Sequence, residues 1–221
     1  MKYRHEIKFI INSNQAEMLK IKLRLLMTPD ANSVDGSYRI TSLYFDDLSS
    51  SAYYEKLNGV LFRKKYRIRL YDNNTSFIRL ECKYKDDNMT RKKQVKVSMD
   101  QAIDLINKKE FESKNDLIKQ FFDDVRLKSL MPSVIVDYNR YALTYPISDV
   151  RITFDSHIKS GNFNNNLFDF DNVHTAVIDD DILVLEVKYN EILPEAIAII
   201  LSTVPMFRQA YSKFAICRSI K

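Results

Sequence analysis

The chain has 221 residues, of which 45% are hydrophobic and 29% charged, a composition typical of a folded globular domain. Its formal net charge of +5 favours an anionic partner. Two cysteines, Cys82 and Cys217, are too few for a disulfide framework, and the opening residues MKYRHEIKF contain no apolar signal-peptide segment. We therefore expect one cytosolic domain over residues 1–221, with no apolar run long enough to span a bilayer.

The predicted elements are mostly strands, with a few helices between them. In chain order we expect a strand at 4–9, a helix at 14–27, strands at 37–46, 63–71, 77–85 and 91–97, helices at 98–108 and 115–130, strands at 133–143, 150–155 and 182–189, and a short helix at 194–203. The polar residues 156–181 predict a long loop, and 208–219 fits either a strand or a helix. This order predicts an α+β fold, an antiparallel barrel of about eight strands with helices packed on the outside.

Charged residues recur at every second position in several of these strands. In 63–71, one face carries Lys65, Arg67 and Arg69 while the other is apolar, and 77–85 repeats the arrangement. A single strand of this kind would be an ordinary solvated face. The repetition over many strands instead predicts that the charged faces line a lumen, where like charges repel unless an anion or paired carboxylates are present. The pattern therefore indicates an anion site.

Several familiar catalytic and nucleotide-binding motifs are absent. With only three glycines, the sequence contains neither GxxxxGK[ST] nor GxGxxG, which excludes a backbone cradle for a nucleotide. CxxC, HExxH and GxSxG are missing as well, and His5, His157 and His174 are too scattered to suggest a shared site. Phosphate chemistry in this chain would have to use side-chain cations and a metal bound by carboxylates.

Seven segments, in order and spanning the chain, resemble the VTC domain, the polyphosphate polymerase domain of the vacuolar transporter chaperone family. They are YRHEIKF (3–9), SLYFDDLSSSAYYEKLNG with RKKYRIRLY (42–71), LECKYK with QVKV (80–97), DYNRYAL (137–143), VRITFD (150–155), LEVKY (185–189) and YSKF (211–214). That family belongs to the triphosphate tunnel metalloenzymes of the CYTH-like superfamily, antiparallel barrels whose lumen binds chains of phosphate. The resemblance implies a polymerase that transfers the terminal phosphate of ATP to a growing polyphosphate chain.

The resemblance also implies roles for individual residues. The catalytic residues would be Arg67, Arg69, Lys83 and Glu186. Phosphate would be bound by the same three cations and by Lys8, Lys96, Tyr138, Arg140, Arg151, Lys188, Ser212 and Lys213. Mn²⁺ or Mg²⁺ would be held by Glu186, with Glu6 and Glu81 as further ligands. The family pattern has a further lysine where this chain has Ala210. The side chain of Arg208 is the one that would extend to the place of that lysine.

The residue types support these roles independently of the resemblance, although alternatives stay open. Arginine donates paired hydrogen bonds to phosphate and keeps its charge, and glutamate offers the hard oxygen that Mg²⁺ prefers. The alternative for Glu186 is an ion pair with Lys188 or an arginine. For Arg67 and Arg69 the alternative is an exposed strand face, and for Tyr138 it is packing.

Two other functions remain open at this stage. One is a tripolyphosphatase or nucleoside triphosphatase on the same barrel, and the other is a non-catalytic module that holds polyphosphate. Hydrolytic relatives open with Glu-x-Glu-x-Lys, whereas this chain reads Arg4-x-Glu6-x-Lys8, which removes a metal ligand, adds a phosphate ligand and favours the polymerase. An enclosed lumen would exclude duplex nucleic acid. By analogy, a separate membrane-protein partner would bring the protein to the inner face of a membrane.

Overall fold

The computed structural model describes residues 4–31, 33, 36–86, 89–161 and 166–220. The strands are β1 (His5–Asn12), β2 (Thr28–Pro29), β3 (Ser37–Asp46), β4 (Phe62–Tyr71), β5 (Ile78–Asp86), β6 (Met89–Val97), β7 (Met131–Tyr145), β8 (Val150–Gly161), β9 (Thr175–Ala176) and β10 (Ile182–Tyr189). The helices are α1 (Ser13–Leu23), α2 (Ser51–Leu57), α3 (Met99–Ile106), α4 (Asp116–Lys128), α5 (Glu195–Ser202) and α6 (Lys213–Ser219), with one 3₁₀ turn at Ile147–Asp149.

Backbone hydrogen bonds join the strands in the order β1-β10-β8-β7-β3-β4-β5-β6, with β2 added to β7 and β9 added to β8. The strand pairs whose register is described here are antiparallel. Since β2 and β9 have two residues each, the sheet has eight main strands. The predicted α+β class with an antiparallel sheet of about eight strands is confirmed.

The chain forms two compact units, each made of separate stretches of sequence. The first unit contains Met1–Arg39, Tyr138–Ile158 and Ile178–Ser212, and the second contains Ile40–Asp137, Lys159–Val177 and Lys213–Lys221. Strands β3, β7 and β8 contribute residues to both units. Each unit has its own hydrophobic core, and the two are described separately below. A single domain over residues 1–221 stays a prediction.

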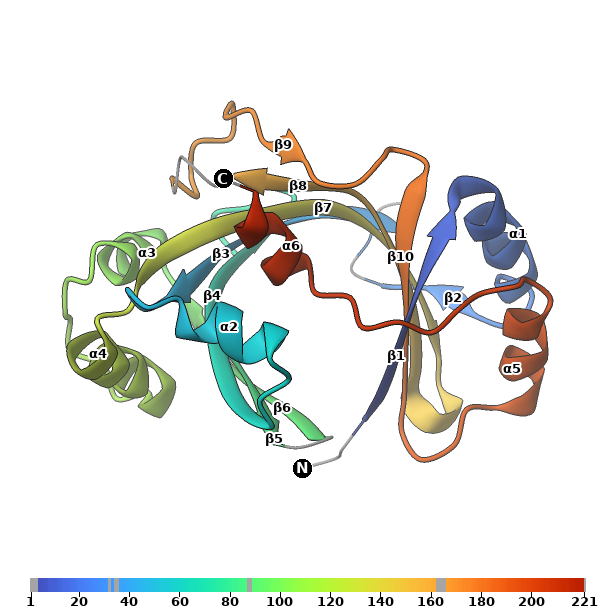
Figure 1. The fold of residues 1–221 in the computed structure, drawn as a ribbon, viewed down its shortest axis with the longest axis horizontal. Coiled ribbons are helices and arrows are strands. Elements are labelled where there is room, and N and C mark those ends of the chain that lie inside the picture. Colours follow the sequence, from blue (N-terminus) through green and yellow to red (C-terminus); the bar gives the residue numbers. More distant parts are fainter. Residues whose placement is uncertain (1–3, 32, 34–35, 87–88, 162–165, 221) are drawn as a thin grey trace. The chain divides into compact units, whose positions relative to one another are not determined.

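In the second unit, α3 and α4 pack on the apolar face of the β4–β5–β6 sheet (Figure 1). Ile68 and Leu80 from the strands and Phe121 from α4 are all fully buried there. The start of α3 follows from a capping box: Ser98 Oγ accepts a hydrogen bond from the Gln101 backbone amide at 3.1 Å, and the Gln101 side chain accepts one from the Ser98 amide at 3.0 Å. The predicted faces of these strands and the predicted start of this helix are confirmed.

In the first unit, α1 and α5 lie side by side over the apolar residues of β1, β8 and β10 (Figure 1). Leu19 and Leu23 of α1 are fully buried, one helical turn apart. Ile21 and Leu25 are apolar as well but are 66% and 81% exposed. Ile21 lies between the two buried leucines and therefore faces the opposite side of the helix, and Leu25 follows the last helical residue.

Two segments also differ from the sequence-based expectation, and a third decides between two alternatives. Helix α2 occupies part of the polar stretch before Gly59, and it buries none of its residues, so no apolar periodicity marks it. It is held instead by the Asp46 carboxylate, which accepts hydrogen bonds from the backbone amides of Ala52 and Tyr53. Strand β8 continues to Gly161 with Ile158 buried, six residues into the expected loop. The C-terminal segment forms α6, a helix.

Phe121 should dominate the stability of the second unit's core, because its ring makes edge-to-face contacts with Phe45, Tyr66 and Phe122 at centroid distances of 5.0–5.6 Å. Phe121→Ala should lower the free energy of unfolding by about 3–5 kcal/mol. Leu127→Ala on the same helix is the control, since Leu127 is 82% exposed. Urea denaturation followed by circular dichroism measures both, and equal midpoints for the two variants would contradict this description of the core.

Candidate functional site

The polar face of β4, β5 and β6 includes three neighbouring cross-strand rows of side chains. The first row is Lys65–Lys83–Lys92, the second is Arg67–Glu81–Gln94, and the third is Arg69–Arg79–Lys96. Neighbouring strands lie about 4.8 Å apart, so like charges in the first and third rows stand directly opposite each other. Such pairs are destabilising unless a counter-charge is near. Among these nine side chains the one carboxylate is Glu81.

Glu81 is the counter-charge of the second row and is only 1% exposed. Its Oε2 atom accepts hydrogen bonds from Arg67 Nε at 2.8 Å and Nη2 at 2.5 Å, and its Oε1 atom lies 3.0 Å from Lys92 Nζ. Burial alone would raise the pKa of Glu81, but the charges of Arg67, Arg69 and Lys92 outweigh it and hold the pKa well below its usual range. Glu81 is therefore ionised, with both oxygens engaged by cations.

Side chains of β3 orient the two arginines of β4. Tyr44 and Ser42 lie opposite Arg67 and Arg69 in the β3–β4 register. Arg67 Nη1 donates to Tyr44 Oη at 2.7 Å, and Arg69 Nε donates to Ser42 Oγ at 3.0 Å. Burial would raise the pKa of Tyr44, but the neighbouring charges of Arg67 and Arg69 lower it overall. Arg69 is 6% exposed, so the exposed-face alternative does not apply to it.

The C-terminal helix contributes an aromatic ring to this polar face. Phe214 of α6 is buried, its ring lies 5.1 Å from that of Tyr44, and Lys65 Nζ lies 4.7 Å from its centroid. Lys213 is the first residue of the same helix. Lys83 is half-buried in the first row, and Lys96 is exposed in the third. The second unit thus brings together Arg67, Arg69, Lys83, Glu81 and Lys96 on one sheet face.

In the first unit, opposite charges face each other across β1 and β10. Lys8 is paired in register with Glu186, and Glu6 with Lys188. Lys8 Nζ lies 3.1 Å from a carboxylate oxygen of each glutamate, and Lys188 Nζ lies 2.8 Å from Glu186 Oε2. Burial would lower the pKa of Lys8, but the charges of Glu186 and Glu6 outweigh it and raise the pKa above its usual value. Both glutamates therefore share a firmly protonated lysine.

Arg140 and Arg151 in the same unit are each fixed by a carboxylate. Asp155 receives two parallel hydrogen bonds from Arg140, at 2.7 and 2.8 Å, and is fully buried. Arg140 also lies 3.7 Å from Glu186 Oε2. Arg151 donates to Asp30 at 2.5 Å and to the Tyr38 hydroxyl at 2.6 Å. Burial would lower the pKa of Arg140, but Asp155, Tyr138 and Glu186 together outweigh it and raise the pKa.

The remaining predicted residues lie near these clusters or at the chain's end. Tyr138 is 4% exposed, and the Arg140 guanidinium lies 5.3 Å from its ring centroid, so Tyr138 both packs and supports that arginine. Lys8 Nζ also donates to the Tyr211 carbonyl at 3.1 Å, next to Ser212. Ala210 and Arg208 are both exposed, and Arg208 forms a single backbone bridge with Phe9.

The carboxylates expected to hold a metal are divided between the two units. Glu6 and Glu186 belong to the first unit and share Lys8, whereas Glu81 belongs to the second. Within the described ranges, no group of three or more His, Cys, Asp or Glu side chains converges. Two carboxylate oxygens, with the other positions filled by phosphate and water, fit Mg²⁺ or Mn²⁺. Glu6 and Glu186 match that donor set, and the Glu186–Lys188 ion pair expected as an alternative is also present.

Sequence reasoning missed the partners that orient the cations, namely Tyr44, Ser42, Asp155, Tyr38 and Asp30. They lie on other segments than the residues they hold, so only the strand register brings them together. Asp155 carried a signal, because it shares the alternating face of Arg151 and Thr153.

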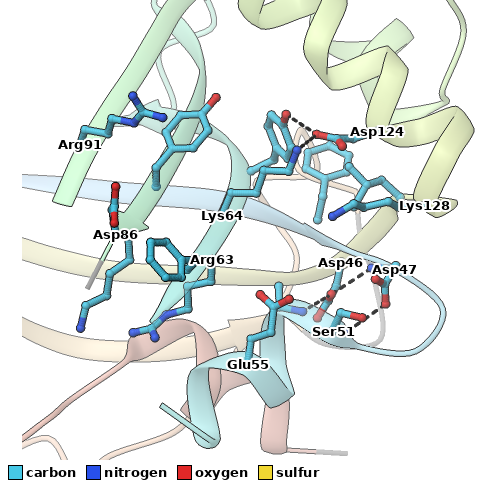
Figure 2. A pocket seen from close by; sticks show the side chains of 17 residues that line it. Asp46, Asp47, Ser51, Glu55, Arg63, Lys64, Asp86, Arg91, Asp124 and Lys128 are labelled. Carbon is cyan, nitrogen blue, oxygen red and sulfur yellow. Dashed lines mark hydrogen bonds and ion pairs between the residues drawn. The ribbon is translucent and has the colours of Figure 1, made fainter. Parts of the chain in front are cut away.

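A cavity of about 340 Å³ lies on the other face of β4 and β5 (Figure 2). Lys64 and Tyr66 line it and alternate along β4 with the row residues Lys65 and Arg67. Its most buried polar groups are already paired, since Asp124 accepts hydrogen bonds from Lys64 at 2.5 Å and from the Tyr66 hydroxyl at 2.6 Å (Figure 2). This network holds α4 to the sheet and is separate from the three rows.

Cys82 and Cys217 are buried free thiols. In the part of the chain that the structure describes, every helix is too short or too polar to cross a bilayer. A cytosolic setting and a membrane-protein partner stay predictions.

Two solved structures share this fold. One is a putative adenylyl cyclase from Hippeastrum whose dominant activity is that of a triphosphatase; its TM-score is 0.57, with 14% sequence identity over 99% of this chain and 96% of that one. The other is a putative adenylate cyclase from Bacillus halodurans, with a TM-score of 0.52 and 12% identity over 92% of this chain and 87% of that one. A search of the curated proteins found no match.

At 14% and 12% identity these likenesses concern the fold alone. The sequence itself is more specific than the fold. A family model for the VTC domain matches residues 3–220, nearly the whole chain, and the protein therefore belongs to the VTC domain family.

Proposed function

We propose that this protein is a polyphosphate polymerase, which transfers the terminal phosphate of ATP to a growing polyphosphate chain with the help of a divalent metal ion. The observation that carries this proposal is the charge of the three cross-strand rows, where seven lysines and arginines share one sheet face with a single carboxylate. A linear polyanion neutralises such a face along its length. Membership of the VTC domain family supports the same substrate class.

Arg67 and Arg69 are the residues that grip the phosphates of the nucleotide. Their guanidinium groups are held by Glu81, Tyr44 and Ser42, so little side-chain freedom is lost when phosphate binds. Phosphoryl transfer needs mainly alignment and neutralisation of charge, which oriented cations supply. The acceptor oxygen at the end of a polyphosphate chain is already ionised, so no general base is required.

In the first unit, Glu186 and Glu6 are the residues that would hold Mn²⁺ or Mg²⁺. A divalent ion bound there would supply positive charge that offsets the negative charge of the phosphates. Lys8 and Lys188 lie within 3.1 Å of the Glu186 carboxylate and add positive charge beside it. Arg140 is fixed by Asp155, and its Nη2 atom lies 3.7 Å from Glu186, so it serves as a further phosphate ligand.

A triphosphatase is the second candidate function, favoured by the triphosphatase activity of the Hippeastrum protein. The first-strand position where hydrolytic relatives carry glutamate is Arg4 in this chain. Arg4 pairs with Asp149 at 3.1 Å. The loss of a carboxylate at this position still favours the polymerase.

Incubation with ATP and Mn²⁺, with and without a short polyphosphate primer, separates the candidate functions. A polymerase releases ADP and lengthens the primer, a triphosphatase releases free phosphate, and a binding module does neither. We expect ADP and longer polymer. Added polyphosphate should compete for the binding site, whereas RNA should not. Free phosphate without polymer would contradict the proposal and support the hydrolase.

Glu186→Gln tests the metal assignment. The amide keeps the size of the side chain but removes the charge that attracts a divalent ion, so synthesis should fall by at least about a hundredfold and need more Mn²⁺ for half-maximal rate. Glu195→Gln on α5 is the matched control, since Glu195 is exposed and should leave the rate unchanged. Full activity of the Glu186 variant at the same Mn²⁺ concentration would show that this carboxylate holds no metal.

A further inference from the structure

We infer that the third row, Arg69–Arg79–Lys96, is a path along which the polyphosphate chain runs from the Arg67–Arg69 pair to the edge of the sheet, and that Arg79 is a phosphate-binding residue in the middle of that path. This inference rests on the proposed function and adds to it the direction in which the polymer leaves one sheet face. The alternation in 77–85 puts Arg79 on the charged face, but neither that pattern nor the family resemblance gave it a role.

The register places the three cations on neighbouring strands. Arg69 lies opposite Arg79, and Arg79 lies opposite Lys96. With strands about 4.8 Å apart, the backbone positions of Arg69 and Lys96 are about 10 Å apart. A triphosphate gripped by Arg67 and Arg69 on β4 has few oxygens left for cations on the next strands. A longer chain of phosphates, gripped at the same place, has further phosphates for the cations of β5 and β6.

The exposure of the row increases toward the sheet edge. Arg69 on β4 is 6% exposed, Arg79 on β5 is half-buried, and Lys96 on β6 is exposed. Strand β6 is the last strand in the hydrogen-bonded order of the sheet. The row therefore leads from a buried arginine to a lysine in contact with solvent, as a path for a polymer requires.

One aromatic ring holds the two outer cations in place. The Arg79 guanidinium lies 4.4 Å from the centroid of the Phe77 ring, and Lys96 Nζ lies 5.8 Å from the same centroid. Arg79 Nη1 also donates to the Gln94 side chain at 3.2 Å. These contacts position both side chains without consuming their charge.

The third row itself contains no acidic side chain. In the ranges that the structure describes, neither Arg79 nor Lys96 forms an ion pair with a carboxylate. Glu81, the carboxylate of this face, forms ion pairs with Arg67 of the second row and Lys92 of the first row. Like charges directly opposite each other on a sheet are destabilising. An anion that lies across the row reduces this repulsion and is attracted by both cations.

The test compares the binding of long-chain polyphosphate with that of tripolyphosphate at several NaCl concentrations, by calorimetry, for wild type and Arg79→Gln. Loss of one phosphate contact should weaken long-chain binding about tenfold and reduce the slope of log K against log salt by about 1. Tripolyphosphate binding should change less than about twofold. Arg79→Lys should restore the salt slope, because it restores the charge.

Lys93→Gln is the matched control, since Lys93 is exposed on β6 but its side chain lies on the opposite sheet face, 6.0 Å from the Tyr84 ring. It removes the same charge and should leave long-chain binding unchanged. Equal losses for both ligands in Arg79→Gln, or equal losses in the two variants, would overturn the path. Binding does not require turnover, so a wild type that binds long chains through Arg79 but makes no polymer would sink the proposed polymerase and leave this inference standing.

Discussion

The structure depends on how buried positive charge is neutralised on the polar faces of its strands. Three carboxylates, Glu81, Asp155 and Glu186, are at most 5% exposed, and each contacts at least one arginine or lysine. Removing one partner of such a buried pair typically costs 3–5 kcal/mol, because the other charge is left without compensation. The antiparallel register supplies these pairs, for example by placing Lys8 opposite Glu186. The cations are therefore held in fixed positions by carboxylates whose removal would destabilise the fold.

Neutralisation is complete in some places and incomplete in others. Arg140 and Arg151 are each satisfied by a carboxylate, whereas the rows of β4, β5 and β6 carry seven cations for one acid. The excess is a cost to the protein alone and a gain once a linear phosphate chain lies across it. The carboxylates thus fix the geometry of the arginines before any ligand binds, and the excess positive charge then attracts an anion.

Much of the fold could be predicted because strand alternation has a period of two. The apolar residues of β4 and β5 identified the covered face, and Ser98 with Gln101 marked a helix start. Helix α2 was not predicted, because it is stabilised by the Asp46 carboxylate and not by an apolar stripe. The cations of the site were predicted from the same alternation and from the family resemblance. Their partners were not, because Tyr44 and Asp155 meet Arg67 and Arg140 only through strand register, which the sequence alone does not specify.

The most direct test of the central claim is the thermal stability of the protein with and without polyphosphate at constant ionic strength. If the charged rows await a linear phosphate polymer, scanning calorimetry should show a melting temperature that rises with polyphosphate concentration, by an amount equivalent to about 2.7 kcal/mol at a hundred times the dissociation constant. Sulfate at matched ionic strength should give a much smaller rise. A melting temperature that responds equally to sulfate and polyphosphate would show that these faces are merely solvated and that the account is wrong.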